Sequence, residues 1–408
     1  MKEWKDKFYM DIIKNENSQK NKEIELLNLK NMEEVKKFHQ SLDSYKKTPL
    51  IRLKNLAEKL GVKEILVKDE SYRFGLKAFK GLGGIYALSR VVCKKLNMEK
   101  ISFAELKSEK VREQIKDMTF VTATDGNHGK GIAWSAAQLG CRAIVYMPKG
   151  SSEIRAQAIR DAGKAEVTIT DMGYDDTVRF AAKMAEEKGW YLVQDTSWDG
   201  YQEIPEWIIQ GYTTMGAEAV EQIEEMGIGT PTHVFLQAGV GAMSGGIMGY
   251  LANRYRDKMP VFSVVEPKEV ACIYESARVN DQKPHEAKGS GITIMAGLNC
   301  GEPCTVTWPI LRDYSDYYFS CPDFISAKGM RTAAAPTGDD RRIVSGESGA
   351  VTLGLTVLLL EKKELEEIRK DMKLDENSII LLFSTEGDTD PEIYKNIIEN
   401  KQNIEPER

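Results

Sequence analysis

The sequence lacks an apolar segment long enough to cross a membrane. Its most apolar run, Ala350–Leu360, is shorter than the roughly 20 residues that a transmembrane helix needs, and it contains Gly354. A buried helix is therefore predicted for this run. The N-terminal residues Met1–Lys20 are rich in lysine, glutamate and asparagine and lack the apolar centre of a secretory signal. We expect a cytoplasmic protein that has no membrane partner.

An excess of positive charge is also missing. The chain has 56 Lys and Arg residues against 62 Asp and Glu residues, which gives a formal net charge of -6. A mildly acidic chain offers no electrostatic reason to bind nucleic acid or an anionic membrane. With 408 residues, 42% of them hydrophobic, the chain is long enough for about two domains with buried cores.

Cysteine is scarce, and its spacing does not fit the usual zinc motifs. There is no Cys-x-x-Cys pair, and Cys300 and Cys304, which are four residues apart, have no histidine nearby. We therefore expect no metal site and mostly buried thiols. A disulfide bridge that involves the regions of Cys272 and Cys300 stays open. The six cysteines are Cys93, Cys141, Cys272, Cys300, Cys304 and Cys321.

Strand-like apolar runs alternate with helical patterns along most of the chain. This alternation predicts an α/β fold with two domains and largely parallel sheets. The predicted strands are Glu64–Asp69, Met118–Thr124, Arg142–Met147, Ala165–Thr170, Tyr191–Asp195, Thr232–Gln237, Pro260–Val265 and Ile379–Thr385. The predicted helices are Phe79–Leu96, Gly129–Leu139, Ser151–Ala162, Tyr174–Lys188, Glu206–Met226 and Gly241–Arg256.

A glycine-rich turn follows the predicted strand at Thr232–Gln237. Here THVFLQAGVGAMSGG leads from an apolar strand through glycines into a helix. Backbone N–H groups in such a turn, together with the helix N-terminus, form a site for a phosphate. A nicotinamide cofactor, with Glu266 as the ribose-binding acid, and a turn without any ligand are the alternatives. The third glycine of a dinucleotide fingerprint is replaced by Ser244, so this turn alone does not decide between them.

Lys80 is the candidate for covalent attachment of a cofactor. It lies in DESYRFGLKAFKGLGG (residues 69–84), at the start of a predicted helix whose next turn is Gly-Leu-Gly-Gly. Small residues there would let a planar ligand approach the backbone. A lysine with a lowered pKa forms a Schiff base with a carbonyl group. Lys77 competes for the role, and a surface lysine without a role is the plainer interpretation.

A polar turn at residues 122–130, TATDGNHGK, also joins a strand to a helix. Asp125, Gly126 and Asn127 form the turn, which is explained equally well as a helix N-cap without a ligand. His128 is expected to be a first-turn helix residue and not a general base.

Several motifs together resemble a known superfamily. AFKGLGG, TDGNHGKG, AGVGAM and STEGDTD are similar to motifs of the fold-type-II pyridoxal-phosphate enzymes, which include tryptophan synthase β and threonine dehydratase. RFGLKAFKGLGG, TDGNHGKGIAW, DMGYDDTVR, QAGVGAM, IMAGLNCGEP, SGESGAV and STEGDTD look like the diaminopropionate ammonia-lyase subfamily. The resemblance runs from about Thr48 to Asp390. Motifs this numerous, in the right order, are far more specific than any one of them.

The resemblance implies a function. It implies a carbon–nitrogen lyase of amino-acid degradation that uses pyridoxal 5'-phosphate. The reaction would be the α,β-elimination of 2,3-diaminopropionate to pyruvate and two molecules of ammonia. A homodimer with a small amino-acid substrate is also implied. The alternatives are a serine or threonine dehydratase of the same fold, a nicotinamide-dependent dehydrogenase and a non-catalytic cofactor-binding protein.

The resemblance also assigns site residues. Lys80 would hold the cofactor as a Schiff base, and Asn127 would bind its ring hydroxyl. Thr385 would place a neutral hydroxyl against the pyridine nitrogen, with Ser384 as the alternative in register; a hydroxyl, unlike a carboxylate, does not hold that nitrogen protonated. The cofactor phosphate would lie on Gly239, Val240, Gly241, Ala242 and Met243. The substrate carboxylate would face the backbone N–H groups of Thr124, Asp125, Gly126 and Asn127.

Asp125 departs from the threonine dehydratase pattern, which typically has serine there. A carboxylate at this place would repel the substrate carboxylate, so we expect Asp125 to act as a base or to bind the second ammonium group of the substrate. With Lys80 and Asp125 as bases on opposite faces of the substrate Cα, the enzyme would accept both the D and the L isomer.

The resemblance further implies two domains with the cofactor in the cleft between them. The large cofactor-binding domain would comprise residues 1–80 and 197–408, and the small domain residues 81–196.

Overall fold

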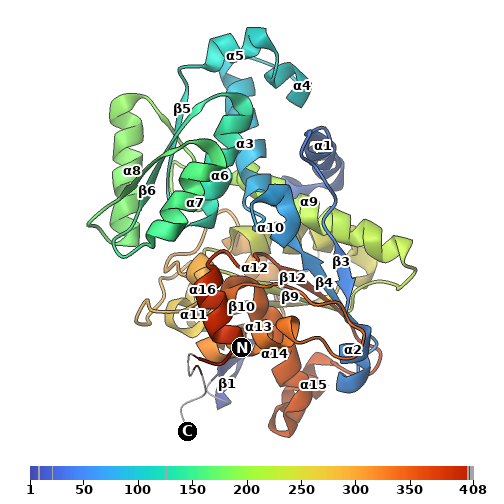
Figure 1. Cartoon of the computed structure of the whole chain (residues 1–408). Coiled ribbons are helices and arrows are strands. Elements are labelled where there is room, and N and C mark those ends of the chain that lie inside the picture. The colour runs from blue at the N-terminus through green and yellow to red at the C-terminus, as the bar shows by residue number, and fades with distance from the viewer. Residues whose placement is uncertain (8–9, 21, 125, 402–403, 405–408) are drawn as a thin grey trace. The chain divides into compact units, whose positions relative to one another are not determined.

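The computed structural model describes residues 1–7, 10–20, 22–124, 126–401 and 404 of the chain (Figure 1). The chain forms two compact units. Unit 1 consists of Met1–Leu29, Thr48–Tyr72 and Met215–Arg408, and unit 2 consists of Lys30–Lys47 and Arg73–Thr214. The division into functional domains at residues 81 and 196 stays a prediction.

Unit 1 is built on one eight-stranded sheet. Its strands are β1 (Lys2–Lys7), β2 (Met10–Lys14), β3 (Leu50–Arg52), β4 (Glu64–Asp69), β9 (His233–Gln237), β10 (Val261–Pro267), β11 (Tyr317–Cys321) and β12 (Ile379–Ser384). The strand order is β1-β2-β11-β10-β9-β12-β4-β3. From β11 to β4 the neighbouring strands are parallel, whereas β2 and β3 pair antiparallel with β11 and β4. Every residue of β9 and β12 is buried, as expected for parallel strands that are covered on both faces.

The helices of unit 1 cover this sheet. They are α2 (Lys54–Leu60), α10 (Ala242–Arg254), α11 (Cys272–Val279), α12 (Trp308–Tyr314), α13 (Asp323–Ala334), α14 (Glu347–Glu361), α15 (Glu366–Met372) and α16 (Pro391–Ile398). The prediction of a buried helix at Ala350–Leu360 is confirmed by α14, whose residues from Glu347 to Leu359 are all buried. Within the described part of the chain, no helix is both long enough and apolar enough to cross a membrane.

Unit 2 is built on a parallel four-stranded sheet in the order β7-β6-β5-β8. Its strands are β5 (Thr119–Ala123), β6 (Arg142–Met147), β7 (Glu166–Ile169) and β8 (Tyr191–Leu192). Its helices are α1 (Leu29–Gln40), α3 (Gly81–Lys95), α4 (Phe103–Leu106), α5 (Glu109–Ile115), α6 (Asn127–Leu139), α7 (Glu153–Gly163) and α8 (Tyr174–Lys188). In Figure 1, α8 lies on one face of the sheet and α6 and α7 lie on the other. The long helix α9 (Glu203–Glu225) begins in unit 2 and ends in unit 1.

The predicted α/β fold with largely parallel sheets is confirmed, although several elements differ from the prediction. Strands β1, β2, β3 and β11 were not predicted; β1 has the sequence KEWKDK, which has too many charges to resemble a buried strand. Strand β8 is shorter than the predicted Tyr191–Asp195. Val193 still donates its N–H to Val121 O over 2.8 Å, but after it the side chains of Gln194 and Asp195 turn to other partners.

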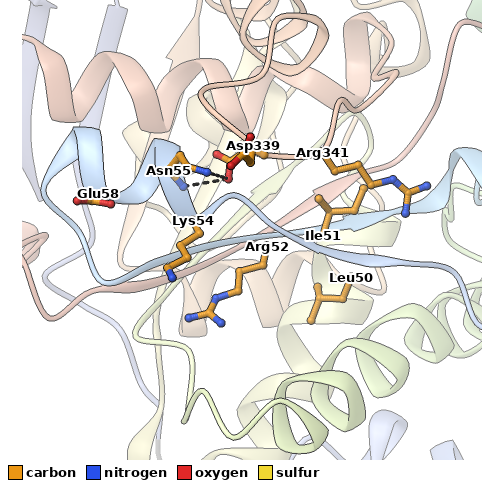
Figure 2. A pocket seen from close by; sticks show the side chains of 9 residues that line it. Leu50, Ile51, Arg52, Lys54, Asn55, Glu58, Asp339 and Arg341 are labelled. Carbon is orange, nitrogen blue, oxygen red and sulfur yellow. Dashed lines mark hydrogen bonds between the residues drawn. The ribbon is translucent and has the colours of Figure 1, made fainter.

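A cleft of about 590 Å³ lies at the β3 edge of unit 1 (Figure 2). Strand β3, helix α2 and residues 339–341 line it. Asp340 Oδ1 accepts the N–H of Asn55 over 2.9 Å, and Oδ2 accepts the N–H of Leu56 over 2.8 Å. Because Leu53, at the N-cap of α2, supplies no side-chain cap, Asp340 caps this helix from a distant loop.

Replacing Asp340 is expected to destabilise unit 1. Asp340→Ala removes both acceptors from the first turn of α2, and we expect a loss of about 1–2 kcal/mol in the free energy of unfolding. Urea denaturation followed by circular dichroism measures this loss. The matched control is Asp339→Ala, because Asp339 is the exposed neighbour in the same loop. Equal losses in the two variants would show that the Asp340 contacts contribute nothing particular.

Candidate active site

Lys80 lies at the N-cap of α3, and its side chain is 17% exposed. Its ammonium nitrogen Nζ forms an ion pair with the carboxylate of Asp195. The same nitrogen lies 5.2 Å from the centre of the Phe79 ring and 5.8 Å from that of Tyr212. The competitor Lys77, by contrast, is exposed. Of the two lysines, only Lys80 therefore lies in a setting that is shielded from water.

The glycines after Lys80 serve helix packing. A Cβ atom at Gly83 would lie 2.6 Å from Cε1 of Tyr212, and one at Gly84 would lie 2.8 Å from Oγ of Ser135. Protein atoms fill the space that a side chain would take at these two positions, and the expectation that the small residues let a planar ligand approach the backbone stays a prediction. The glycines let α3 approach α6 and α9 closely.

Asp195 is a site residue that the sequence analysis missed. It follows β8 and is buried, and its Oδ2 lies 3.6 Å from Nδ1 of His128. Burial alone would raise the pKa of Asp195, but His128 and the Lys80 ammonium outweigh burial and lower this pKa to about 2. Asp195 is therefore an anion at neutral pH. Its position directly after a parallel strand was the signal that could have marked it.

His128 is a buried residue in the first turn of α6, as predicted. Its Nε2 lies 2.9 Å from Val193 O, which only accepts hydrogen bonds, so Nε2 carries the proton. Burial lowers the pKa of His128 and outweighs the opposing effect of Asp195. The neutral ring is held by Val193 and lies beside the carboxylate that pairs with Lys80.

The turn before α6 is held by Thr124. Its hydroxyl oxygen accepts the N–H of Gly126 over 3.0 Å and that of Gly129 over 3.2 Å, and its own N–H donates to Tyr146 O over 3.0 Å. Two of the N–H groups predicted to face the substrate carboxylate, those of Thr124 and Gly126, are thus bonded within the protein. Asn127 begins α6. The predicted base Asp125 lies outside the described residues.

The predicted phosphate loop connects β9 to α10 in unit 1. Gly241 has a φ of +91°, and a Cβ there would lie 2.6 Å from Cδ1 of Leu311, so only glycine fits. Val240 O accepts the N–H of Cys304 over 2.7 Å, and this hydrogen bond holds the loop in place. The first-turn N–H groups of a helix have no acceptors within the helix, so the N-terminus of α10 at Ala242 and Met243 fits a phosphate group.

Two hydroxyl side chains lie at the carboxyl end of β12, and both are buried. Ser384 Oγ donates to Ser345 Oγ over 2.7 Å. Thr385 Oγ1 accepts a hydrogen bond from the amide nitrogen of Gln237 over 2.9 Å. Gln237 is the last residue of β9, so it connects the predicted ring-nitrogen partner to the start of the phosphate loop.

Glu266 does not fit the role of a ribose-binding acid. Its carboxyl oxygens accept the N–H groups of Ile273 over 2.8 Å and Tyr274 over 2.6 Å, at the start of α11. Burial raises its pKa to about 8. Both carboxyl oxygens of Glu266 are thus bonded at the start of α11. This argues against a ribose-binding role and therefore against the nicotinamide alternative.

All six cysteines are free thiols. Cys272 is buried next to the phosphate loop, where its Sγ lies 3.5 Å from Gly239 O. Burial raises the pKa of Cys272 well above its ordinary value. Cys141 and Cys300 are half-buried, and the other four cysteines are buried.

Comparisons with known proteins show the family of this chain. The family model described as "Pyridoxal-phosphate dependent enzyme" matches residues 42–372. The chain is 50% identical over 380 residues to the diaminopropionate ammonia-lyase of Salmonella typhimurium, with 92% of this chain and 94% of that one covered. The biosynthetic L-threonine dehydratase of Pasteurella multocida is 26% identical, with 75% of this chain and 51% of that one covered.

Solved structures also show similarity to diaminopropionate ammonia-lyase. Selenomethionine-incorporated holo diaminopropionate ammonia-lyase from Escherichia coli matches with a TM-score of 0.90 and 45% identity, over 96% of this chain and 97% of that one. Other structures of that enzyme hold an aminoacrylate-PLP azomethine reaction intermediate or D-serine. The chain belongs to the pyridoxal-phosphate-dependent enzymes, with the type-II fold. Its similar relatives within that family are diaminopropionate ammonia-lyases, and its cofactor is pyridoxal phosphate.

The raised pKa of Glu266 gives stability a defined pH dependence. The ordinary pKa of the group is 4.5 and the folded value is about 8, so folded Glu266 keeps a proton that the unfolded chain releases. Its stabilisation is complete below the unfolded pKa and is lost as pH rises through the folded pKa. As pH rises from about 5 to about 9, the free energy of unfolding should fall less in Glu266→Gln than in the parent protein. The difference between the two falls should be roughly 3–5 kcal/mol.

Urea denaturation at a series of pH values tests this expectation. Glu269→Gln is the control, since Glu269 is a neighbouring carboxylate with a lowered pKa. A difference between Glu266→Gln and the parent protein that stays constant over the whole pH range would contradict the raised pKa.

Proposed function

We propose that this chain is a diaminopropionate ammonia-lyase, which converts 2,3-diaminopropionate into pyruvate and two molecules of ammonia. The observation that carries the proposal is the 50% identity to an enzyme of that name over nearly the full length of both chains. The half-buried Lys80, paired with an ionised carboxylate, supports it from the structure. The chain is accordingly a carbon–nitrogen lyase.

Lys80 carries out the central steps of the proposed reaction. Pyridoxal phosphate, when bound, supplies an electron sink for the electron pair of the broken Cα–H bond. Lys80 Nζ holds the cofactor and, once displaced by the substrate amine, takes the proton from Cα. The Cβ–N bond then breaks, a Cα–Cβ double bond forms, and the β-amino group leaves as ammonia. The released 2-aminoacrylate tautomerises and takes up water, which gives pyruvate and the second ammonia.

The residues of unit 1 bind the cofactor in this proposal. Its phosphate lies on Gly239, Val240, Gly241, Ala242 and Met243, where the N-terminus of α10 favours a negative charge. Thr385 faces the ring nitrogen, and in unit 2 Asn127 binds the ring hydroxyl. Glycine at position 241 is supported by its left-handed backbone and by Leu311, which leaves no space for a side chain.

Asp195 controls the charge state of Lys80 in this proposal. A carboxylate with a pKa of about 2 is a poor proton donor at neutral pH, but it holds an ammonium group well. Lys80 must lose its proton before its nitrogen can bond to carbon, so the ion pair with Asp195 has to break first. The carboxylate that is set free can then pair with an ammonium group of the substrate.

Asp125 is the second base in this proposal. Lys80 takes the Cα proton on one face of the bound substrate and Asp125 takes it on the other, so both enantiomers react. The E. coli relative crystallised with D-serine supports the entry of a D-amino acid into such a site. Threonine dehydratases, which typically have serine at this place, remain the alternative within the fold, but they are much less similar to this chain.

We also propose that the enzyme is a cytoplasmic homodimer. Resemblance to the superfamily supports the dimer, and the six free thiols fit a reducing compartment.

Turnover assays test the proposed activity. We expect kcat/KM for diaminopropionate to exceed that for serine or threonine by at least about 100-fold, because a site built for an ammonium group discriminates strongly against a hydroxyl. Pyruvate release measures the rate. Lys80→Ala should lose turnover by more than about 1000-fold, because it removes both the cofactor bond and a base.

The exposed neighbour provides the control, since Lys77→Ala should keep nearly full activity. Borohydride reduction followed by peptide mapping should find the pyridoxyl group on Lys80. Preferred turnover of threonine would favour the dehydratase alternative, and a pyridoxyl group on Lys77 or Lys130 would overturn the assignment of Lys80.

The two-base proposal predicts a difference between enantiomers. Asp125→Asn keeps the size of the side chain but cannot take up a proton, so turnover of the D isomer should fall by at least about 100-fold while the L isomer is affected much less. Separate kcat/KM values for the two isomers, with cofactor occupancy checked by absorbance, measure this. Equal losses would leave Asp125 as a binding residue only.

A further inference from the structure

We propose that Gln237 makes the Thr385 hydroxyl a hydrogen-bond donor toward the cofactor, and that it thereby selects the unprotonated form of the cofactor ring nitrogen. Gln237 would then be a positioning residue, since it acts through Thr385. The inference rests on the proposed function, in which Thr385 faces that nitrogen.

Gln237 and Thr385 are brought together by parallel pairing. Strands β9 and β12 are neighbours, with His233 opposite Ile380 and Val234 opposite Leu381. Their carboxyl ends therefore meet at the same edge of the sheet. Gln237 ends β9 and is 1% exposed, and Thr385 follows β12 and is 3% exposed. The contact between them is shielded from water, so its hydrogen-bond geometry is not averaged by solvent.

The orientation of the Gln237 amide is fixed by its other partner. The amide nitrogen Nε2 lies 2.8 Å from Phe383 O and 2.9 Å from Thr385 Oγ1. A backbone carbonyl can only accept, so the NH2 end of the amide must face Phe383. An NH2 group has two hydrogens, and one serves each partner.

The carbonyl end of the amide supports this orientation. Gln237 Oε1 is buried and has no hydrogen-bond partner among the described residues. A buried acceptor that stays unpaired destabilises the folded protein. Rotating the amide by half a turn would place that oxygen against Phe383 O, where two acceptors would face each other and the bond to Phe383 would be lost. The observed orientation therefore leaves Gln237 Oε1 without a partner among the described residues and keeps the NH2 end bonded to Phe383 O and Thr385 Oγ1.

The consequence for Thr385 follows from its single proton. Its oxygen already accepts from Gln237, so the hydroxyl proton is left to donate elsewhere. The hydroxyl proton is matched by a ring nitrogen with a free lone pair, whereas a protonated nitrogen would have to use the second lone pair of Thr385 Oγ1 and would leave the hydroxyl proton without this acceptor. The neighbouring Ser384 does not compete, because its hydroxyl donates to Ser345.

The carboxylate of Glu386, beside Thr385, faces another group. Glu386, the next residue, accepts the N–H of Ser348 over 2.9 Å at the start of α14. Glu347 is the other buried carboxyl in that turn. Glu386 thus caps a helix, and the polarity of the Thr385 hydroxyl depends on Gln237.

Gln237→Glu reverses the polarity with little change in size. The introduced carboxyl oxygen carries at most one proton, and Phe383 O takes it, so the same oxygen must accept the Thr385 proton. The Thr385 oxygen then presents a lone pair, which a protonated ring nitrogen satisfies. We expect the protonated fraction of that nitrogen to rise about tenfold, the equivalent of one hydrogen bond. The 15N resonance of labelled pyridoxal phosphate in the holoenzyme, at a single pH, measures it.

A double-mutant cycle separates this effect from the added carboxyl group itself. Thr385→Val removes the hydroxyl group through which Gln237 would act. In this background, Gln237→Glu should therefore leave the 15N resonance unchanged. A shift that persists in this background would show direct action of the carboxyl group and would overturn the proposal. Gln237→Met is the second variant in case Gln237→Glu does not fold. It frees the hydroxyl to rotate, and we expect an intermediate shift.

The outcomes also distinguish this inference from the proposed function. If Thr385→Val moves the 15N resonance but neither Gln237 variant does, the polarity inference alone is wrong. If Thr385→Val leaves the resonance unchanged, the ring nitrogen does not face Thr385 and the proposed cofactor site is wrong. Circular dichroism and thermal unfolding of each variant confirm that the comparison is made between folded proteins.

Discussion

Parallel strand pairing decides where chemistry can be placed in each of the two units. In a parallel sheet all carboxyl ends lie at one edge, and the polar side chains that follow them are gathered there. In unit 1 this edge carries Gln237 at the end of β9, Glu266 near the end of β10 and Thr385 after β12. In unit 2 it carries Thr124 after β5 and Asp195 after β8. None of these residues needs to be close to another in sequence, because the sheet brings them together.

Two buried carboxyl groups at these edges show how their partners set their charge. Burial alone would raise the pKa of Asp195, but His128 and the Lys80 ammonium beside it lower this pKa to about 2. Glu266 has backbone N–H groups of α11 and the Cys272 side chain as partners, and burial outweighs them and raises its pKa to about 8. The same type of group is therefore an anion in one unit and largely a neutral acid in the other at neutral pH. The first fits a partner for ammonium groups, and the second fits a structural support behind the phosphate loop.

Sequence patterns were sufficient where the signal is local. Strands β4 and β6 and helix α8 have the predicted bounds because a continuous apolar run or a helical repeat defines each of them. The predictions of the glycine loop and of Lys80 rest on motifs that span only a few residues. Asp195 and Gln237 were missed because their contacts, to Lys80 and Thr385, span 115 and 148 residues. The packing role of the glycines after Lys80 was not predicted, because a sequence does not show which helices approach a glycine.

The chain order of unit 1 has a consequence for its synthesis on the ribosome. Strand β4 is made early, but β12, its parallel neighbour in the sheet, is encoded more than 300 residues later, and Asp340, which caps α2, also comes late. Until β12 has emerged, one edge of an entirely buried strand stays unpaired. Most of unit 2 is continuous in sequence, so its folding does not depend on a segment that is synthesised much later. Unit 2 can therefore fold first on the nascent chain, whereas the sheet of unit 1 keeps an open strand edge until β12, its last strand, has been made.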